Sequence, residues 1–148
     1  MGKIAIVGMP AEAKELLEVR LRHDISGVDS YEDASTALLN LRPTDYELMV
    51  LGLMMPDGNN PAFSELVRHR QDYPKVCELY IKQVRAGNRN IPILVTEDDN
   101  GINEAFPGAR DRVLKAGANA YIDIKEVNGY SGLAETIRKY LKTPVLST

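Results

Sequence analysis

Four short runs of apolar residues recur along the chain without alternating with polar residues. They occupy residues 4–7, 48–51, 93–95 and 120–122. Continuous apolar strands are typical of parallel sheets whose two faces are both covered by helices. A fifth and more polar run, residues 28–31, suits a strand at the edge of such a sheet, where one flank is open to water. The pattern therefore predicts five parallel strands.

Stretches in which apolar residues recur at helical spacing lie between these strands. We expect helices over residues 11–23, 34–41 and 132–142, and another that ends at Ala116 before Gly117, which suits the left-handed position after a helix. The residues expected to start or cap the first, second and last of these helices are Pro10, Asp33 and Ser131. The stripes expected to face the sheet are Leu16, Leu17 and Leu21 in the first helix and Ala37, Leu38 and Leu41 in the second.

Two connections are long. Residues 58–91 have room for two helices, of which the second should begin at Pro74 and end at Gly87. The apolar residues that mark the first of the two are Phe63, Leu66 and Val67. Residues 97–108 form a long acidic connection, and loops of this kind are usually functional or mobile.

The alternation of strands and helices predicts an α/β, three-layer, doubly wound fold. Its five-stranded parallel sheet should have the strand order 2-1-3-4-5, because that order places the polar second strand at an edge. A single domain should cover residues 1–148, since this length lies near the commonest domain size.

Composition and charge narrow the classes of function. The net charge is -3 and the basic residues are scattered, so the stripe of cations that a duplex-binding protein uses is missing and we expect no direct contact with nucleic acid. The apolar run at residues 4–7 is too short for a signal peptide or a membrane span, so we expect a cytoplasmic protein without a membrane partner. Cys77 is the only cysteine, which excludes an intrachain disulfide and favours a buried, neutral thiol.

Three segments, taken in order, resemble one known family. Residues 45–58 read DYELMVLGLMMPDG and resemble the third strand and following loop of response-regulator receiver domains. Residues 91–96 resemble the fourth strand of that family, with its terminal Thr96, and residues 116–122 resemble its fifth. The resemblance implies a flavodoxin-like receiver fold with an enlarged third helical region, and a place in two-component signal transduction.

The chemistry of that family depends on carboxylates that this chain lacks. An Asp at the end of the third strand accepts a phosphoryl group, and two acidic residues after the first strand hold Mg²⁺. Gly52 stands at the acceptor position, and Gly8 and Met9 stand at the acidic pair. Glycine offers no ligand and a thioether is too soft for Mg²⁺, so we expect no phosphorylation at the usual position and no metal or cofactor.

Other parts of the family's pocket are kept. Thr96 matches the Thr or Ser of the fourth strand, whereas Lys125 lies one residue later than the family's spacing from Tyr121. In the family, Thr96 and Tyr121 match the positions that couple the pocket to a partner or dimer surface on the last two helices and the fifth strand. We therefore expect a non-enzymatic pseudo-receiver that works by protein–protein interaction, with a protein partner or a second copy of itself.

Three alternatives stay open. The chain could be a small-ligand protein or an enzyme that binds an anion or nucleotide in the vacated pocket, where Gly8 and Gly52 would leave space and Thr96 and Lys125 would supply polar groups. Asp57 could be a displaced acceptor, although Asp-Gly is ordinary turn chemistry. The remaining acidic residues near strand ends, which read more simply as a solvated acidic rim, could form a relocated cation site; they are Glu97, Asp98, Asp99 and Asp123.

Overall fold

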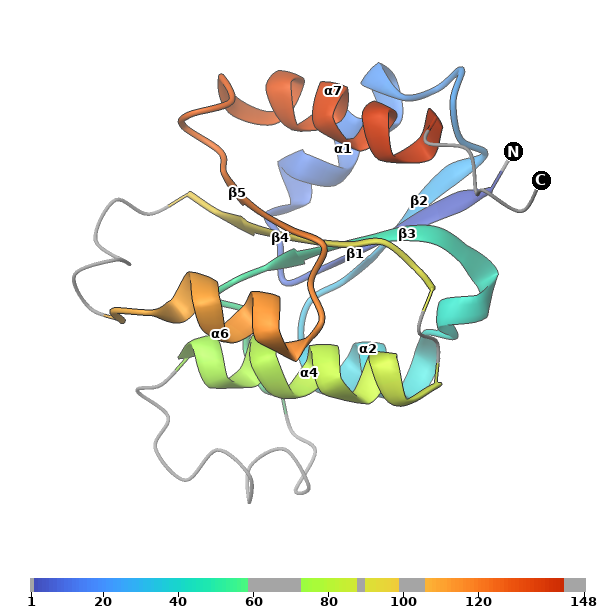
Figure 1. Ribbon diagram of the computed structural model, residues 1–148. Helices are drawn as coiled ribbons and strands as arrows, with labels where there is room; N and C mark the ends of the chain where they lie inside the picture. Colours follow the sequence, from blue (N-terminus) through green and yellow to red (C-terminus); the bar gives the residue numbers. More distant parts are fainter. Residues whose placement is uncertain (1, 59–72, 88–89, 99–105, 143–148) are drawn as a thin grey trace.

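A five-stranded, all-parallel sheet forms the middle of three layers in the computed structural model (Figure 1), which describes residues 2–58, 73–87, 90–98 and 106–142. Its strands are β1 (Lys3–Val7), β2 (Gly27–Tyr31), β3 (Tyr46–Gly52), β4 (Ile93–Glu97) and β5 (Ala120–Asp123). They lie in the order β2-β1-β3-β4-β5, which confirms the predicted doubly wound sheet.

Helices cover both faces of this sheet (Figure 1). One face carries α1 (Ala11–Arg20) and α7 (Gly129–Lys142). The other face carries α2 (Ala34–Asn40), α4 (Tyr73–Gly87) and α6 (Ala109–Ala116). A short 3-10 turn, η1 (Pro43–Asp45), leads into β3.

The apolar strands fill two separate cores because their successive side chains point to opposite faces of the sheet. The side chains that face α2, α4 and α6 include Ala5, Val7, Met49, Leu51, Ile93 and Val95. Those that face α1 and α7 include Ile4, Ile6, Leu48, Val50, Leu94 and Ile122. A strand buried on both sides has no polar face, which explains the unbroken apolar runs in the sequence.

The predicted helices that fall within the described residues are present, but several details were wrong. The expected stripes included Leu16 and Leu38, yet each is 40% exposed. Each lies one residue, or about 100° of helical rotation, from a fully buried neighbour, so it points away from the sheet. The last helix begins at Gly129, so Ser131 lies inside it and is not its cap.

Other predicted ends and caps can be compared directly. The first helix ends at Arg20, three residues before its predicted end, and the second of the two helices expected before β4 spans Tyr73–Gly87, close to prediction. The Asp33 carboxylate accepts the Thr36 N–H at 2.7 Å, which confirms the predicted cap. The first of those two helices, with Phe63, Leu66 and Val67, lies outside the described residues.

Two charged groups join α4 to its neighbours. The Glu78 carboxylate is nearly buried and accepts hydrogen bonds from Arg112 Nε on α6 at 3.0 Å and from Lys75 Nζ at 3.2 Å. Burial alone would raise the pKa of Glu78, but these two cations outweigh it and lower the pKa below its usual value. At the end of α4, the Arg85 guanidinium donates to the carbonyl oxygens of Gly117 at 2.9 Å and Ile91 at 2.6 Å.

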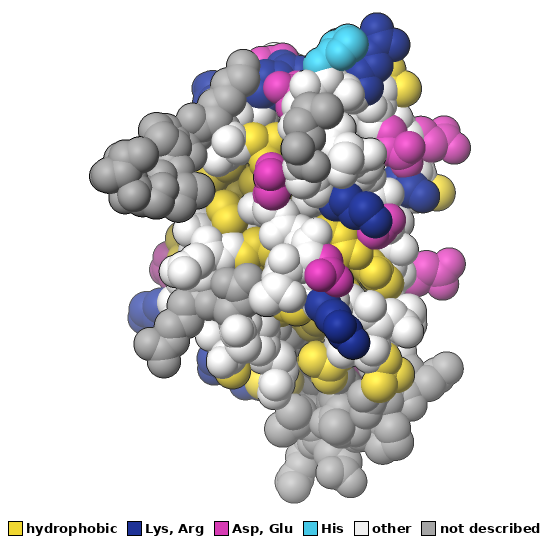
Figure 2. Space-filling view, turned by 90° about the vertical axis from the view of Figure 1, so that its right-hand side faces the viewer, with side chains coloured by type: hydrophobic (Ala, Val, Ile, Leu, Met, Phe, Trp, Pro, Cys, Tyr) yellow, Lys and Arg dark blue, Asp and Glu magenta, His cyan; other side chains and the backbone are white. Residues whose placement is uncertain are grey.

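The surface agrees with a chain of mixed charge. On the face shown in Figure 2, Lys and Arg side chains lie singly among Asp and Glu, and no continuous basic strip crosses it. Within the described ranges, no helix is both long and apolar enough to cross a membrane. Cys77 is fully buried, and burial raises the pKa of its thiol, so the group is neutral as expected.

Candidate functional site

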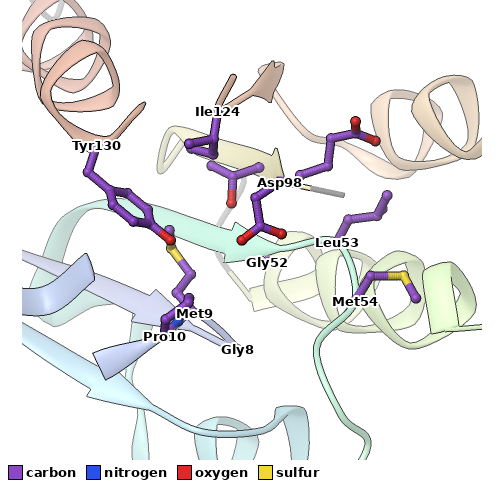
Figure 3. A pocket seen from close by; sticks show the side chains of 11 residues that line it. Gly8, Met9, Pro10, Gly52, Leu53, Met54, Asp98, Ile124 and Tyr130 are labelled. Atoms are coloured by element: carbon purple, nitrogen blue, oxygen red, sulfur yellow. The ribbon is translucent and has the colours of Figure 1, made fainter. Parts of the chain in front are cut away.

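A small hollow lies where β1, β3 and β4 end (Figure 3). Doubly wound sheets bind ligands at this edge, where the chain turns to opposite faces after neighbouring strands. The lining residues are Gly8, Met9, Pro10, Gly52, Leu53, Met54, Thr96, Glu97, Asp98, Ile124 and Tyr130. Its volume is about 50 Å³, which holds a few water molecules, whereas sites for small molecules usually measure roughly 300–1,000 Å³.

The floor of the hollow is closed by backbone. A Cβ atom built on Gly52 would lie 2.4 Å from the carbonyl oxygen of Gly8, closer than real Cβ atoms come to any atom. Gly8 has φ +70°, and its own Cβ would lie 2.4 Å from the Cβ of Met55. The loops after β1 and β3 therefore pack main chain against main chain. The two glycines therefore leave little of the space that the small-ligand alternative requires.

Backbone hydrogen bonds hold these two loops in place. The Gly8 N–H donates to the Tyr31 carbonyl oxygen at 2.8 Å, which ties the end of β1 to the end of β2. The Met55 N–H donates to the Gly52 carbonyl oxygen at 3.1 Å and closes the turn after β3. The Leu53 N–H donates to the main-chain carbonyl oxygen of Thr96 on β4 at 2.9 Å. The close contact between Gly8 and Gly52 is thus fixed from both sides.

The mouth of the hollow is partly apolar. Met9, which we aligned with one of the family's two acidic residues, packs with the core beneath α1 and α7. Tyr130 from α7 reaches in beside Met9, and Ile124 lies above it (Figure 3). Burial, and then the nearby charges of Asp98 and Glu12, raise the pKa of the Tyr130 hydroxyl. A thioether, an aliphatic side chain and a neutral phenol offer Mg²⁺ no carboxylate.

Of the two polar residues expected in the pocket, Thr96 lies in it and Lys125 lies outside it. Thr96 lines the hollow, is 4% exposed, and donates its hydroxyl proton to the Leu51 carbonyl oxygen at 3.2 Å. Lys125 is exposed and does not line the hollow; its main-chain N–H donates to the Asp123 carboxylate at 2.9 Å. Four of the five expected pocket residues therefore meet in one place, and Lys125 lies outside it.

Asp57 lies in a turn tied to α2. Its carbonyl oxygen accepts the Ser35 N–H at 3.1 Å and also the Ser35 hydroxyl, while the preceding Pro56 carbonyl accepts the Ala34 N–H. Asp57 is not among the residues that line the hollow. This placement favours the turn interpretation over a displaced acceptor.

Those acidic residues near the strand ends that the structure describes do not form a metal site. Asp98 is exposed and its carboxylate points toward Gly52 in Figure 3. Asp123 accepts the Lys125 N–H, and Asp99 lies outside the described residues. Throughout the part of the chain that the structure describes, no group of three or more His, Cys, Asp or Glu could hold a metal ion.

For Glu97 the interpretation as a solvated rim was wrong. Glu97 is only 6% exposed, and its Oε2 accepts the hydroxyl proton of Tyr121 at 2.5 Å. Burial first, and then this hydrogen bond, raise the pKa of Tyr121, so its hydroxyl stays protonated. A signal in the sequence could have found the pair, since Glu97 lies two residues after buried Val95 and so shares its face of the sheet.

Comparison with solved structures supports the receiver fold. No family model and no curated protein matches the chain. Among solved structures, a response regulator from Hahella chejuensis matches with a TM-score of 0.68 at 19% identity, covering 97% of each chain. The BeF3-activated DrrB receiver domain matches at 0.66 and 13% identity, over 96% of this chain and 98% of that one.

A third match is the non-phosphorylated HemR receiver domain from Leptospira biflexa, with a TM-score of 0.59 at 20% identity. It covers 96% of this chain and 95% of that one. Receiver domains in an activated and in a non-phosphorylated state thus both match over nearly their full length. The chain therefore has the flavodoxin-like receiver fold, and the likeness as a whole does not distinguish between the two states.

Proposed function

We propose that this chain is a receiver-like signalling module that acts by binding a protein partner or a second copy of itself, without being phosphorylated. The observation that carries the proposal is the contact at Gly52, where even a methyl group would meet the Gly8 carbonyl oxygen at 2.4 Å. An aspartyl phosphate needs a side chain at that position and a metal to neutralise the phosphoryl oxygens. At the positions that we align with the acceptor and the metal-binding pair, the chain has Gly52, Gly8 and Met9.

The vacated pocket itself is poorly suited to a small ligand. The hollow of about 50 Å³ is several-fold smaller than an ordinary site for a nucleotide or metabolite. Its one buried hydroxyl, that of Thr96, already donates to a main-chain carbonyl. Lys125, the cation that would attract an anion, does not line it. The receiver fold together with a closed pocket therefore supports a binding module rather than an enzyme.

The partner surface that we propose consists of α6, β5 and α7. In the receiver family this face often binds partners or forms dimers, and Tyr121 on β5 lies within it. Exposed residues that are available on it include Lys115 of α6. Interaction through this face would let the module signal without chemistry at the strand ends.

Phosphodonor treatment tests the first half of the proposal. The protein is incubated with acetyl phosphate and Mg²⁺, and separately with beryllofluoride and Mg²⁺, and is followed by intact-mass spectrometry and by amide NMR. We expect no gain of the mass of a phosphoryl group and no saturable change in the spectra. Labelling that disappears in Asp57→Asn or Asp98→Asn would locate an acceptor and refute the proposal.

Binding through the proposed face is tested with a matched pair of charge reversals. Lys115→Glu changes α6, which belongs to the proposed surface, and Lys14→Glu changes α1, which does not belong to it. Sedimentation of the purified protein measures self-association, and affinity capture from the native host measures partner binding. We expect Lys115→Glu to weaken one of these and Lys14→Glu to leave both unchanged. Equal effects of the two variants would contradict the assignment of the face.

A further inference from the structure

We infer that Glu97 is an internal latch that holds Tyr121 in one orientation and separates the α6–β5 face from the pocket. The inference rests on the proposed function only in taking that face as the partner surface. It assigns a positioning role to Glu97, which lines the hollow but is not one of the pocket residues that the resemblance to the family predicts. It also explains how the chain can keep Thr96 and Tyr121, the two positions that couple pocket and partner surface in the family, without coupling between them.

The latch joins the ends of two neighbouring strands. Glu97 is the last residue of β4, and its nearly buried carboxylate accepts the Tyr121 hydroxyl at 2.5 Å. Its main-chain carbonyl also accepts the Ile124 N–H, just after β5, at 2.9 Å. Side chain and backbone of one residue therefore both bind the same segment, which leaves Tyr121 little freedom to rotate outward.

The same contacts separate Tyr121 from Thr96. In the register of β4 and β5, Val95 pairs with Tyr121 and Thr96 pairs with Ile122. Tyr121 packs with the core under α4 and α6, whereas Ile122 belongs to the core under α1 and α7. Adjacent side chains of a strand point to opposite faces, so the side chain of Thr96 leaves the sheet on the face away from Tyr121.

Each of the two hydroxyls also has its own acceptor. The Thr96 hydroxyl donates to the Leu51 main chain on β3, and the Tyr121 hydroxyl donates to Glu97. Because its acceptor is a main-chain carbonyl of β3, the Thr96 hydroxyl is held against the sheet. We therefore expect the orientation of Tyr121 to follow its bond to Glu97 and not the position of the Thr96 hydroxyl.

The latch should be strong because its acceptor is a carboxylate with little access to water. A hydrogen bond to a charged group contributes more than one between neutral groups, and a buried carboxylate without its donor is costly. Loss of the bond should therefore raise the rate of local opening around β5 and α6 about 10- to 100-fold, which corresponds to roughly 1.4–2.7 kcal/mol.

Amide hydrogen exchange of the full chain measures this opening directly. The variants are Tyr121→Phe, Glu97→Ala, the double variant and the conservative Glu97→Gln, whose side-chain oxygen still accepts a hydrogen bond. Exchange is compared over α6 and over residues 118–124. Two controls go with them: Tyr140→Phe on α7, and Thr96→Val in the pocket. All variants are first checked for a native circular dichroism spectrum and a cooperative unfolding transition.

The latch predicts a specific pattern. Tyr121→Phe and Glu97→Ala each speed exchange in α6 and residues 118–124 by about tenfold or more, and the double variant adds less than the sum of the two effects. Glu97→Gln recovers part of the protection, because its neutral oxygen accepts a weaker hydrogen bond than the carboxylate. Thr96→Val and Tyr140→Phe leave exchange in α6 within about twofold of the wild type.

Two results would overturn the inference. One is additivity of the two single variants, which would mean that the residues act separately. The other is faster exchange in α6 for Thr96→Val equal to that for Tyr121→Phe, which would mean that pocket and face are still coupled. Either result leaves the proposed function standing, whereas phosphoryl transfer to the chain would defeat that function without touching the latch.

Discussion

Replacing Gly52 tests the closed pocket most directly. Gly52→Asp restores the residue type that accepts phosphoryl groups in receiver domains, and Gly52→Ala adds only a methyl group. If the site were an intact pocket that lacks its acceptor, Gly52→Asp would fit and would recover part of the chemistry. The contact with Gly8 predicts instead that both variants are destabilised and that neither is phosphorylated.

The size of the effect follows from the geometry. The new Cβ would lie 2.4 Å from the Gly8 carbonyl oxygen, so reaching even 3.0 Å requires a backbone shift of about 0.6 Å. The Gly8 N–H is held by the Tyr31 carbonyl at 2.8 Å, and β3 and β4 are paired at Gly52 and Thr96, so neither loop gives way easily. Overpacking of this kind costs about 2–3 kcal/mol, or roughly 6–12 °C in Tm for a chain of this length.

Urea unfolding followed by circular dichroism is a suitable assay, since the chain has no Trp for fluorescence. Gly27→Ala is the matched control, because a Cβ at that strand position meets no atom within 4 Å. We expect the control to change the free energy of unfolding by less than about 1 kcal/mol. Gly52→Asp should unfold at least as easily as Gly52→Ala, because its carboxylate would lie beside a carbonyl oxygen without a cation.

Equal stability of Gly52→Ala and Gly27→Ala would refute the closed pocket, because the backbone contact would then carry no cost. The closed pocket is also refuted if Gly52→Asp gains the mass of a phosphoryl group from acetyl phosphate and Mg²⁺. A stable Gly52→Asp that stays unphosphorylated would show that the missing metal ligands alone block the reaction.

Three further predictions concern the scaffold around the site. Gly132→Ala should destabilise the protein by about 2 kcal/mol or more, because its Cβ would lie 1.3 Å from the Val127 carbonyl oxygen. In an unhindered helix the same substitution usually stabilises. Thermal unfolding measures the effect, with Gly87→Ala as the control because its Cβ meets no atom within 4 Å. Glu78→Gln should lower the free energy of unfolding by about 1–3 kcal/mol at pH 7. The folded-state pKa of Glu78 is lowered, so its contribution to stability is present above the unfolded-state pKa and is lost when the carboxylate is protonated. Urea titrations should therefore show the difference from wild type shrinking as the pH falls below about 4. Arg85→Lys should lower stability by about 1–3 kcal/mol in the same assay, since one ammonium cannot reach all the carbonyls that the guanidinium fork binds; an unchanged midpoint would contradict this.

The fold could be predicted well from the sequence because the evidence for it is local and repeated. An apolar run with no polar face can lie only between two layers, and four such runs with a polar fifth lead to one sheet order. The wrong predictions of which helix residues face the sheet also come from relying on local pattern. The pattern around Leu16 and Leu38 shows that a helix is amphipathic, but the apolar stripe of such a helix is wider than the part that its neighbours cover.

From the sequence by itself we predict that the phosphoryl chemistry is missing, because Gly8, Met9 and Gly52 have no carboxylate at the positions that we align with the family's acidic residues. Only the tertiary structure decided what stands in its place. The contact between Gly8 and Gly52, and the bond between Glu97 and Tyr121, join residues far apart in the sequence. Periodicity tells which face a side chain takes, but a distance between two strand ends depends on register, twist and loop path, which the packing of the whole sheet sets.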